Sequence, residues 1–232
     1  MKIINASLMC NGRDEGLSYD LRRKATVYQE FGIDRHVVDK IRNAGFIPDI
    51  LFLQIQSDKI DGASTVSMFK DLIQDLQSKG TKVINWNGDI RGAFPSWMVQ
   101  MGATINAFTN MRDAKACSNG KFLQIGIDPF IFKKWKVDPT NDVVFMGNNY
   151  GNQFPLGTLR QEACRIIRRK FNGKLYGNYE GSTANLNANP KNPFENQSKE
   201  AKIYSACAIA ISISHFNVER YTSDRLLSSM GS

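Results

Sequence analysis

The stretch that decides the fold is IYSACAIAISISHFNVERYTSDRLLSSMGS, residues 203–232. Apolar residues predominate from 208 to 214, a run that predicts a strand buried on both faces. A polar turn follows. Ser223 and Asp224 then predict the start of a helix, because their side chains accept hydrogen bonds from free N–H groups of a first turn. A strand, a loop and a helix in this order are the repeating unit of an α/β protein.

Arg225 stands in the first turn of that predicted helix. The positive end of a helix dipole disfavours a cation there by up to about 1 kcal/mol. A strand, a loop and a helix N-terminus with such an arginine describe an anion site, most simply for phosphate or diphosphate. His215, at the end of the strand, is a further candidate ligand, with a structural hydrogen bond as the alternative. Tyr221 is a candidate to stack on a nucleotide base, as are Trp86, Tyr204 and Phe216, with core packing as the alternative.

The same alternation of strands and helices extends over the rest of the chain, which predicts α/β layers with mostly parallel sheets. Further strands are expected at 2–5, 50–54, 82–85, 107–109, 121–124, 143–146 and 174–176. Helical spacing predicts helices at 19–31, 36–44, 65–79 and 159–171. Charge, Pro and Asn interrupt the pattern at 133–141, so two domains are expected, 1–135 and 136–232, with a cleft between them. Residues 178–198 contain six Asn and two Pro, which predicts a long loop.

A second candidate anion-binding segment follows the strand at 143–146. Gly147, Asn148 and Asn149 can bring successive N–H groups close to a phosphate, although a tight turn explains them equally well. Arg160, like Arg225, is predicted in the first turn of a helix, and a guanidinium matches phosphate oxygens bidentately.

Asp89 is the candidate general base. It follows the predicted strand at 82–85, and ligands of open α/β sheets bind outside the carboxyl ends of strands. A carboxylate there can deprotonate or orient an acceptor hydroxyl. A turn-capping carboxylate, paired with Arg91, is the structural alternative.

The run RYTSDRLLSSMGS at 220–232 resembles a helix motif in the nucleotide-sugar half of GT-B glycosyltransferases, and most closely the CgeB-type (spore-maturation-protein-like) family. Further pieces resemble the same family in the same order: PDILFLQIQ at 48–56, INWNGDIR at 84–91, FTN at 108–110, LQIGIDPFIF at 123–132 and DVVFMGNNYGNQFPLGTLRQE at 142–162. The resemblance covers roughly residues 48–232.

The resemblance implies two Rossmann-like domains of the GT-B type: an acceptor-side domain, 1–135, and a nucleotide-sugar-binding domain, 136–232. It implies a metal-independent transferase that moves a sugar from a nucleotide-diphosphate sugar, its co-substrate, to an acceptor hydroxyl, with no other cofactor. Asp89 would be catalytic. The donor would be held by Gly147, Asn148, Asn149, Arg160, His215, Tyr221, Ser223, Asp224 and Arg225.

Two departures from the family pattern keep alternatives open. Retaining members often carry Glu in the final helix, where this chain has Ser228. The family's domain also continues for two or three strand–helix units past the motif, which predicts either a truncated second domain or an unusually short member. A catalytically inactive relative that binds nucleotides or nucleic acid is therefore one alternative, and a DNA-modifying glycosyltransferase is another.

Composition and short motifs limit the classes of protein to which the chain can belong. The 232 residues carry a net charge of +8, explained by a diphosphate site or by a polyanionic acceptor such as DNA or a cell-surface polymer. No apolar run approaches the ~20 residues that span a bilayer, and no signal peptide is evident. Four separated cysteines predict reduced thiols in a cytoplasmic protein without a metal site. The sequence lacks G-x-G-x-x-G, P-loop and G-x-S-x-G motifs, which disfavours dinucleotide oxidoreductases, P-loop NTPases and serine hydrolases.

Overall fold

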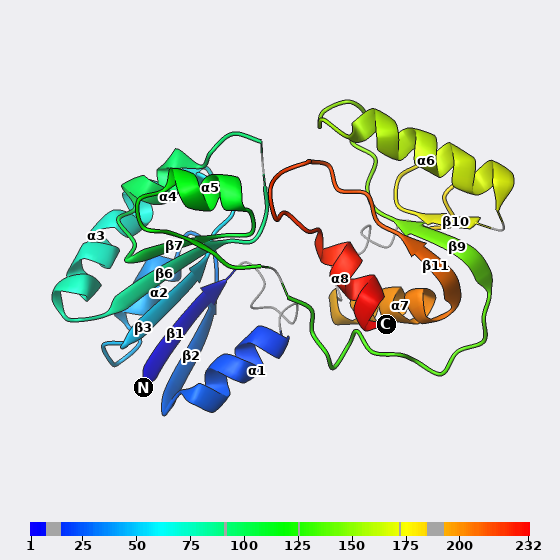
Figure 1. Ribbon diagram of the computed structural model, residues 1–232. Helices are drawn as coiled ribbons and strands as arrows, with labels where there is room; N and C mark the ends of the chain where they lie inside the picture. The colour runs from blue at the N-terminus through cyan, green and yellow to red at the C-terminus, as the bar shows by residue number, and fades with distance from the viewer. Residues whose placement is uncertain (8–14, 91, 125, 172, 185–192) are drawn as a thin grey trace. The chain divides into compact units, whose positions relative to one another are not determined.

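The computed structural model describes residues 1–7, 15–90, 92–124, 126–171, 173–184 and 193–232, and it shows an α/β chain of two compact units (Figure 1). Unit 1 comprises Met1–Gln124 and Val218–Arg220, and unit 2 comprises Ile125–Asn217 and Tyr221–Ser232. The sequence placed the boundary between 135 and 136. The observed division comes earlier because Ile131 and Phe132 are buried against Ala201, a residue of unit 2.

Unit 1 is built on a six-stranded parallel sheet with the order β2-β1-β3-β6-β7-β8. Its strands are β1 (Lys2–Ser7), β2 (Val27–Gly32), β3 (Ile50–Gln54), β6 (Lys82–Asn87), β7 (Ile105–Phe108) and β8 (Gly120–Phe122). The chain moves from β1 to one side and then returns to the other, so the strand order reverses at β1. A two-residue pair, β4 (Lys59–Ile60) with β5 (Ala63–Ser64), forms a separate antiparallel hairpin.

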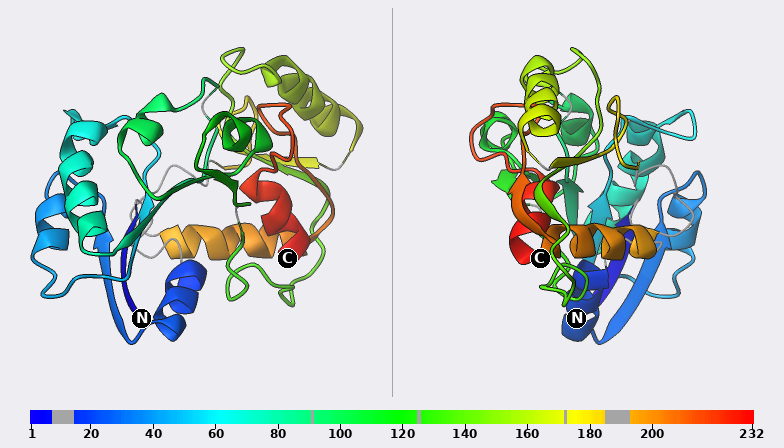
Figure 2. Two further views of the ribbon diagram at one scale, coloured as in Figure 1. Left: turned by 60° about the vertical axis from the view of Figure 1, so that its left-hand side comes forward. Right: turned by 90° about the vertical axis from the view of Figure 1, so that its right-hand side faces the viewer.

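Helices cover both faces of this sheet. On one face lie α2 (Val37–Arg42) and α3 (Thr65–Ser78) (Figure 2). Leu51 and Leu53 of β3 belong to one buried cluster with residues of both helices, and Phe69 of α3 is fully buried there. The predicted stripe of α3 is confirmed, and its N-cap Ser64 accepts a hydrogen bond from the N–H of Ser67. Two short helices, α4 (Ser96–Gln100) and α5 (Met111–Ala116), complete the later crossovers.

The helix predicted over 19–31 is wrong. The chain forms α1 (Glu15–Lys24) and then β2, which pairs with β1 along its whole length. β2 is an edge strand that is only partly buried, so it lacks the apolar run by which a central strand is recognised. Several polar and charged side chains of this region form hydrogen bonds with Glu30.

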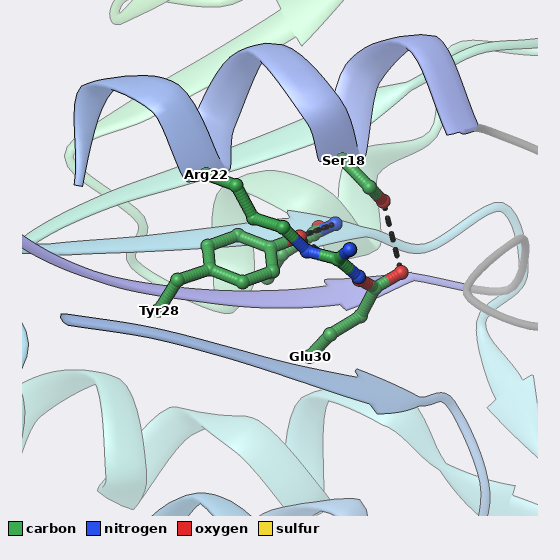
Figure 3. Close-up of polar contacts among 5 residues, drawn as sticks. Ser18, Arg22, Tyr28 and Glu30 are labelled. Carbon is green, nitrogen blue, oxygen red and sulfur yellow. Dashed lines mark hydrogen bonds and ion pairs between the residues drawn. The ribbon is translucent and has the colours of Figure 1, made fainter.

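Glu30 fixes α1 to the sheet (Figure 3). Its Oε1 accepts a hydrogen bond from the Ser18 hydroxyl at 2.9 Å. Its Oε2 accepts from Arg22 Nη2 at 3.1 Å and from the Tyr28 hydroxyl at 3.1 Å. Burial raises the pKa of Tyr28, so its hydroxyl remains a donor at neutral pH. Phe31 packs against the buried cluster that contains Phe69 of α3. Tyr28 and Glu30 alternate with Phe31 along the strand, so their contacts lie on the opposite face of the sheet.

Unit 2 is built on a three-stranded parallel sheet with the order β10-β9-β11. Its elements are β9 (Asn141–Met146), α6 (Gly157–Lys170), β10 (Gly173–Tyr176), α7 (Pro193–Ser205), β11 (Cys207–Ile211) and α8 (Asp224–Gly231). Cys164 and Ile167 of α6 pack on one face of the sheet, and Tyr204 of α7 packs on the other. Figure 1 shows α8 lying next to α7.

Two expectations in unit 2 are corrected. Residues 193–198, predicted as part of a long loop, form the first turns of α7, while 185–192 lie outside the described residues. The strand predicted to be buried over 208–214 ends at Ile211, and Ile209 is 55% exposed. Among the described residues β11 is an edge strand with a neighbour on one side only, which explains its partial exposure.

In the part of the chain that the structure describes, no helix combines the length and the apolar character needed to cross a membrane.

Candidate functional site

The carboxyl ends of β9, β10 and β11 meet at one edge of the unit 2 sheet, because the three strands are parallel. Parallel α/β sheets bind their ligands at this edge. The nine residues predicted to hold a donor belong to the segments that leave it. Gly147, Asn148 and Asn149 follow β9, Arg160 lies near the start of α6, His215, Tyr221 and Ser223 follow β11, and Asp224 and Arg225 begin α8.

Two glycines let the loops after β9 and β10 touch. Gly147 has a φ of +155°, and a Cβ at this position would lie 2.5 Å from Arg160 Nη2. Gly177 has a φ of +143°, and a Cβ there would lie 1.9 Å from the carbonyl oxygen of Gly147. The N–H of Gly147 donates to the carbonyl of Tyr176 at 2.9 Å. A side chain at Gly177 would therefore push the two loops apart, and one at Gly147 would displace the guanidinium of Arg160.

Asn149 is also engaged within the protein. Its N–H donates to the side-chain oxygen of Asn178, and its carbonyl accepts from Asn178 Nδ2 at 3.0 Å. Its own Oδ1 accepts from the N–H of Gly151 at 2.9 Å. The N–H groups of Gly147 and Asn149, expected to face a phosphate, thus lock the loop into one conformation.

Arg160 is the most deeply buried charge at this edge, with 3% of its surface exposed. Its Nη2 donates to the carbonyl of Asn148 at 3.2 Å, its Nε to the Tyr179 hydroxyl at 3.4 Å, and its Nη1 to the carbonyl of Ile213. Its guanidinium also lies 5.2 Å from the centre of the Phe145 ring. One side chain therefore joins the loops that follow β9, β10 and β11.

No carboxylate of the described residues lies within ion-pair distance of this guanidinium. A buried cation without a counter-charge is costly, and carbonyl dipoles compensate it only in part. Arg160 accordingly contributes a positive charge to this edge, and a bound anion would stabilise it. The geometry gives the arginine a positioning role as well as an electrostatic one.

His215 lies in the loop after β11, two residues after Ile213, whose carbonyl accepts a hydrogen bond from Arg160. The carbonyl of His215 accepts from the N–H of Leu156 at 3.1 Å, which ties the loop after β11 to the start of α6. Burial, then the positive charges of Arg160 and Arg225, lower the pKa of His215 to about 4. The imidazole is therefore neutral at neutral pH. Its Nδ1 is buried and has no hydrogen-bond partner among the described residues.

The first turn of α8 is not capped by the side chain of its N-cap residue. Ser223 is the N-cap residue, but its hydroxyl lies 3.0 Å from the Ser212 hydroxyl and makes no capping hydrogen bond. Free N–H groups at a helix start attract anions. Asp224 is the first residue of the helix, and Arg225 occupies the predicted first-turn position, where its side chain is half-buried.

An aromatic cluster adjoins this edge. Tyr150 contacts Phe154 and His215, with ring centres 5.4 and 5.2 Å apart, and Phe154 contacts Phe216 at 5.2 Å. Tyr221 completes the cluster at 6.5 Å from Phe216. Sequence reasoning missed Tyr150, Phe154 and Tyr179, although Tyr150 stands within the Gly-Asn loop motif. Nothing in a single sequence separates an exposed loop tyrosine from a buried one.

Three of the four aromatic residues predicted to meet a base belong to the core. Trp86 is 7% exposed, Tyr204 6% and Phe216 8%, so their packing alternative holds. Tyr221 is partly exposed.

Asp89 lies at the carboxyl edge of the other sheet, in unit 1. Its N–H donates to Asn87 Oδ1 at 3.2 Å, and its own Oδ1 accepts from the N–H of Ile90 at 2.8 Å. These local bonds orient the carboxylate, which is half-buried two residues after the end of β6. Arg91, its predicted structural partner, lies outside the described residues.

Within the described residues, no group of three or more His, Cys, Asp and Glu side chains is arranged to hold a metal ion. The sequence matches no protein-family model, and no curated protein is significantly similar to it.

Proposed function

We propose that the protein is a glycosyltransferase of the GT-B type, which moves a sugar from a nucleotide-diphosphate sugar to an acceptor hydroxyl. Unit 2 would bind the donor at the carboxyl edge of its sheet. Unit 1 would supply Asp89 to the acceptor. The motif resemblance along residues 48–232 suggests the reaction, and the residues at the edge of unit 2 suggest where the donor binds.

The observation that carries the proposal is the positive charge of two arginines at the carboxyl edge of the unit 2 sheet. Among the described residues no carboxylate lies within ion-pair distance of the buried Arg160, and Arg225 lies in a helix first turn where a cation is unfavourable. Both guanidinium charges act on His215. A diphosphate would compensate all three effects at once, and an uncharged ligand would compensate none of them.

In the proposed reaction, Asp89 accepts the proton of the acceptor hydroxyl as its oxygen attacks the anomeric carbon of the sugar. The bond from that carbon to the diphosphate oxygen breaks, and the electron pair leaves with the diphosphate. Arg225 and the N–H groups at the start of α8 stabilise this developing charge. Arg160 holds the loops that surround the leaving group.

The test is turnover. Full-length protein is incubated with UDP-, GDP-, ADP- and dTDP-sugars, with and without saccharides and duplex DNA as acceptors, and released nucleoside diphosphate is measured. We expect release from one donor class, increased by an acceptor and lost in the Asp89→Asn variant. Absence of release from every donor, by protein that nevertheless binds nucleoside diphosphates, would exclude the transferase.

A nucleotide-binding protein without transfer activity is the second candidate, and Ser228 favours it. This residue is 5% exposed, and its carbonyl accepts from the Ser232 hydroxyl at 2.8 Å. It stands where retaining members of the resembling family often carry Glu. The second candidate predicts nucleotide affinity with no turnover in the same experiment.

A further inference from the structure

Tyr150 is the outermost ring of the aromatic cluster in unit 2, with 42% of its surface exposed. It stands three residues after Gly147, in the loop whose carbonyl at Asn148 receives Arg160. Its hydroxyl accepts a hydrogen bond from Asn148 Nδ2 at 3.3 Å. An exposed aromatic ring is thus part of the same short loop that helps to form the proposed diphosphate site.

Two neighbouring rings, Phe154 and His215, pack against the ring of Tyr150. The plane of Phe154 is inclined by 87° to that of Tyr150, and the plane of His215 by 60°. Phe216, which supports Phe154 in turn, is 8% exposed. Because neither neighbour stacks flat on Tyr150, these contacts hold the ring in place and leave it able to stack with a planar ligand. A tyrosine held in this way loses little conformational entropy when it binds.

We infer that Tyr150 is the platform on which the base of the bound nucleotide stacks. This inference rests on the proposed function, because it needs a nucleoside diphosphate at the edge of unit 2. It adds the recognition of the base to that of the diphosphate, and it assigns this recognition to a residue that is exposed, rather than to Trp86, Tyr204 or Phe216, which are buried.

Calorimetry with pyrophosphate, glucose 1-phosphate, UDP, GDP and ADP separates the two parts of the ligand. We expect at least one nucleoside diphosphate to bind wild-type protein more tightly than pyrophosphate does. Tyr150→Ala should weaken the binding of that nucleotide by about ten-fold, since stacking on an aromatic side chain contributes roughly 1–3 kcal/mol per base. The affinity for pyrophosphate should not change. Tyr150→Phe should retain full affinity, because it keeps the ring.

Phe171→Ala is the matched control. Phe171 is an exposed aromatic residue of the same unit, at 51% exposure, but it follows the other end of α6. Its removal should leave both affinities unchanged. If Tyr150→Ala lowers the melting temperature, Tyr150→Leu, which keeps an apolar side chain without a ring, is compared in its place.

The outcomes distinguish the inference from the proposed function. Equal losses for the nucleotide and for pyrophosphate would show that Tyr150 only shapes the loop, and an unchanged nucleotide affinity would show that it does not contact the base. A loss for glucose 1-phosphate as large as that for the nucleotide would assign the ring to the sugar. Each of these results overturns the inference while the anion site stands. If no probe binds wild-type protein, the donor site itself is disproved and the inference fails with it.

Discussion

At the level of single residues, the charged and titratable groups at the carboxyl edge of the unit 2 sheet are expected to differ in how much they contribute to stability. Arg225 is half-buried in a helix first turn, where the dipole makes a cation slightly unfavourable, so its removal should not destabilise the protein. Arg225→Ala should leave the melting temperature within about two degrees and raise the dissociation constant for a nucleoside diphosphate about ten-fold or more, the scale of a charge-assisted hydrogen bond. Arg225→Lys should restore only part of the affinity, because a point charge lacks the planar fork. Thermal shift and calorimetry on the three proteins check this. A large loss of stability with unchanged affinity would instead identify a structural arginine.

His215 gives the site a predictable response to pH. Its pKa in the folded protein, about 4, lies below the ordinary value of 6.5, so the unfolded chain binds the proton more readily. The stability that depends on the neutral imidazole is therefore complete above pH 6.5 and is lost as the pH falls towards 4. Chemical denaturation at pH 7 and pH 5 should show a smaller drop in the free energy of unfolding for His215→Gln than for wild type. Carboxylates titrate in both proteins, so the comparison isolates the histidine. Equal drops would mean that His215 is not held neutral by its surroundings.

At the level of elements, Arg160 connects segments that are distant in sequence. Its three donors reach Asn148, Tyr179 and Ile213, one in each loop at the carboxyl edge of the sheet. Arg160→Met keeps the apolar stem against Phe145 but leaves buried acceptors without donors. We expect it to lower the free energy of unfolding by about 2–4 kcal/mol and to lose nucleotide affinity as well. Urea denaturation and calorimetry measure the two effects. If affinity falls and stability does not, Arg160 contacts the ligand directly and does not hold the loops.

The elements also show what a single sequence can predict. Strands β1, β3, β6, β9 and β10 and helix α3 follow from apolar runs and from the spacing of their buried residues. Helix α6 was predicted from the spacing of its apolar residues, but Leu159 and Ile166 of that stripe are exposed, and the buried residues include Arg160, Cys164 and Ile167 instead. β2 and α7 did not follow, because β2 is a partly buried edge strand and α7 begins in a segment rich in Asn and Pro. The cap residues Ser223 and Asp224 predicted the position of Arg225. Helical spacing placed Arg160 near the start of a helix, which begins two residues earlier than expected, at Gly157. The contacts of Arg160 with Tyr179 and Ile213 and the exposure of Tyr150 depend on the packing of three separate loops, which no local pattern encodes.

At the level of the whole molecule, the proposed reaction draws on residues of two units, each with its own core. Asp89 belongs to unit 1, and the proposed donor site belongs to unit 2. Asp89→Asn should therefore leave donor affinity near normal while lowering the rate of transfer by about 10²-fold or more, the range of general acid–base effects. Calorimetry and turnover on the same preparation check both halves of this statement. Turnover at the wild-type rate would make Asp89 a turn residue and would require another base.

The central claim, that a nucleoside diphosphate binds at the carboxyl edge of the unit 2 sheet, is tested most directly by the imidazole resonances of the protein. The chain has two histidines: His215 lies at this edge, and His36 is exposed in unit 1, immediately before α2. Full-length protein is titrated with UDP, GDP, ADP and dTDP while both imidazoles are followed by NMR at constant pH. The account predicts that at least one nucleotide shifts the His215 resonance in a saturable manner and leaves His36 unchanged. If no nucleotide shifts His215 at millimolar concentration, or if His36 alone responds, the donor site is not where these residues place it.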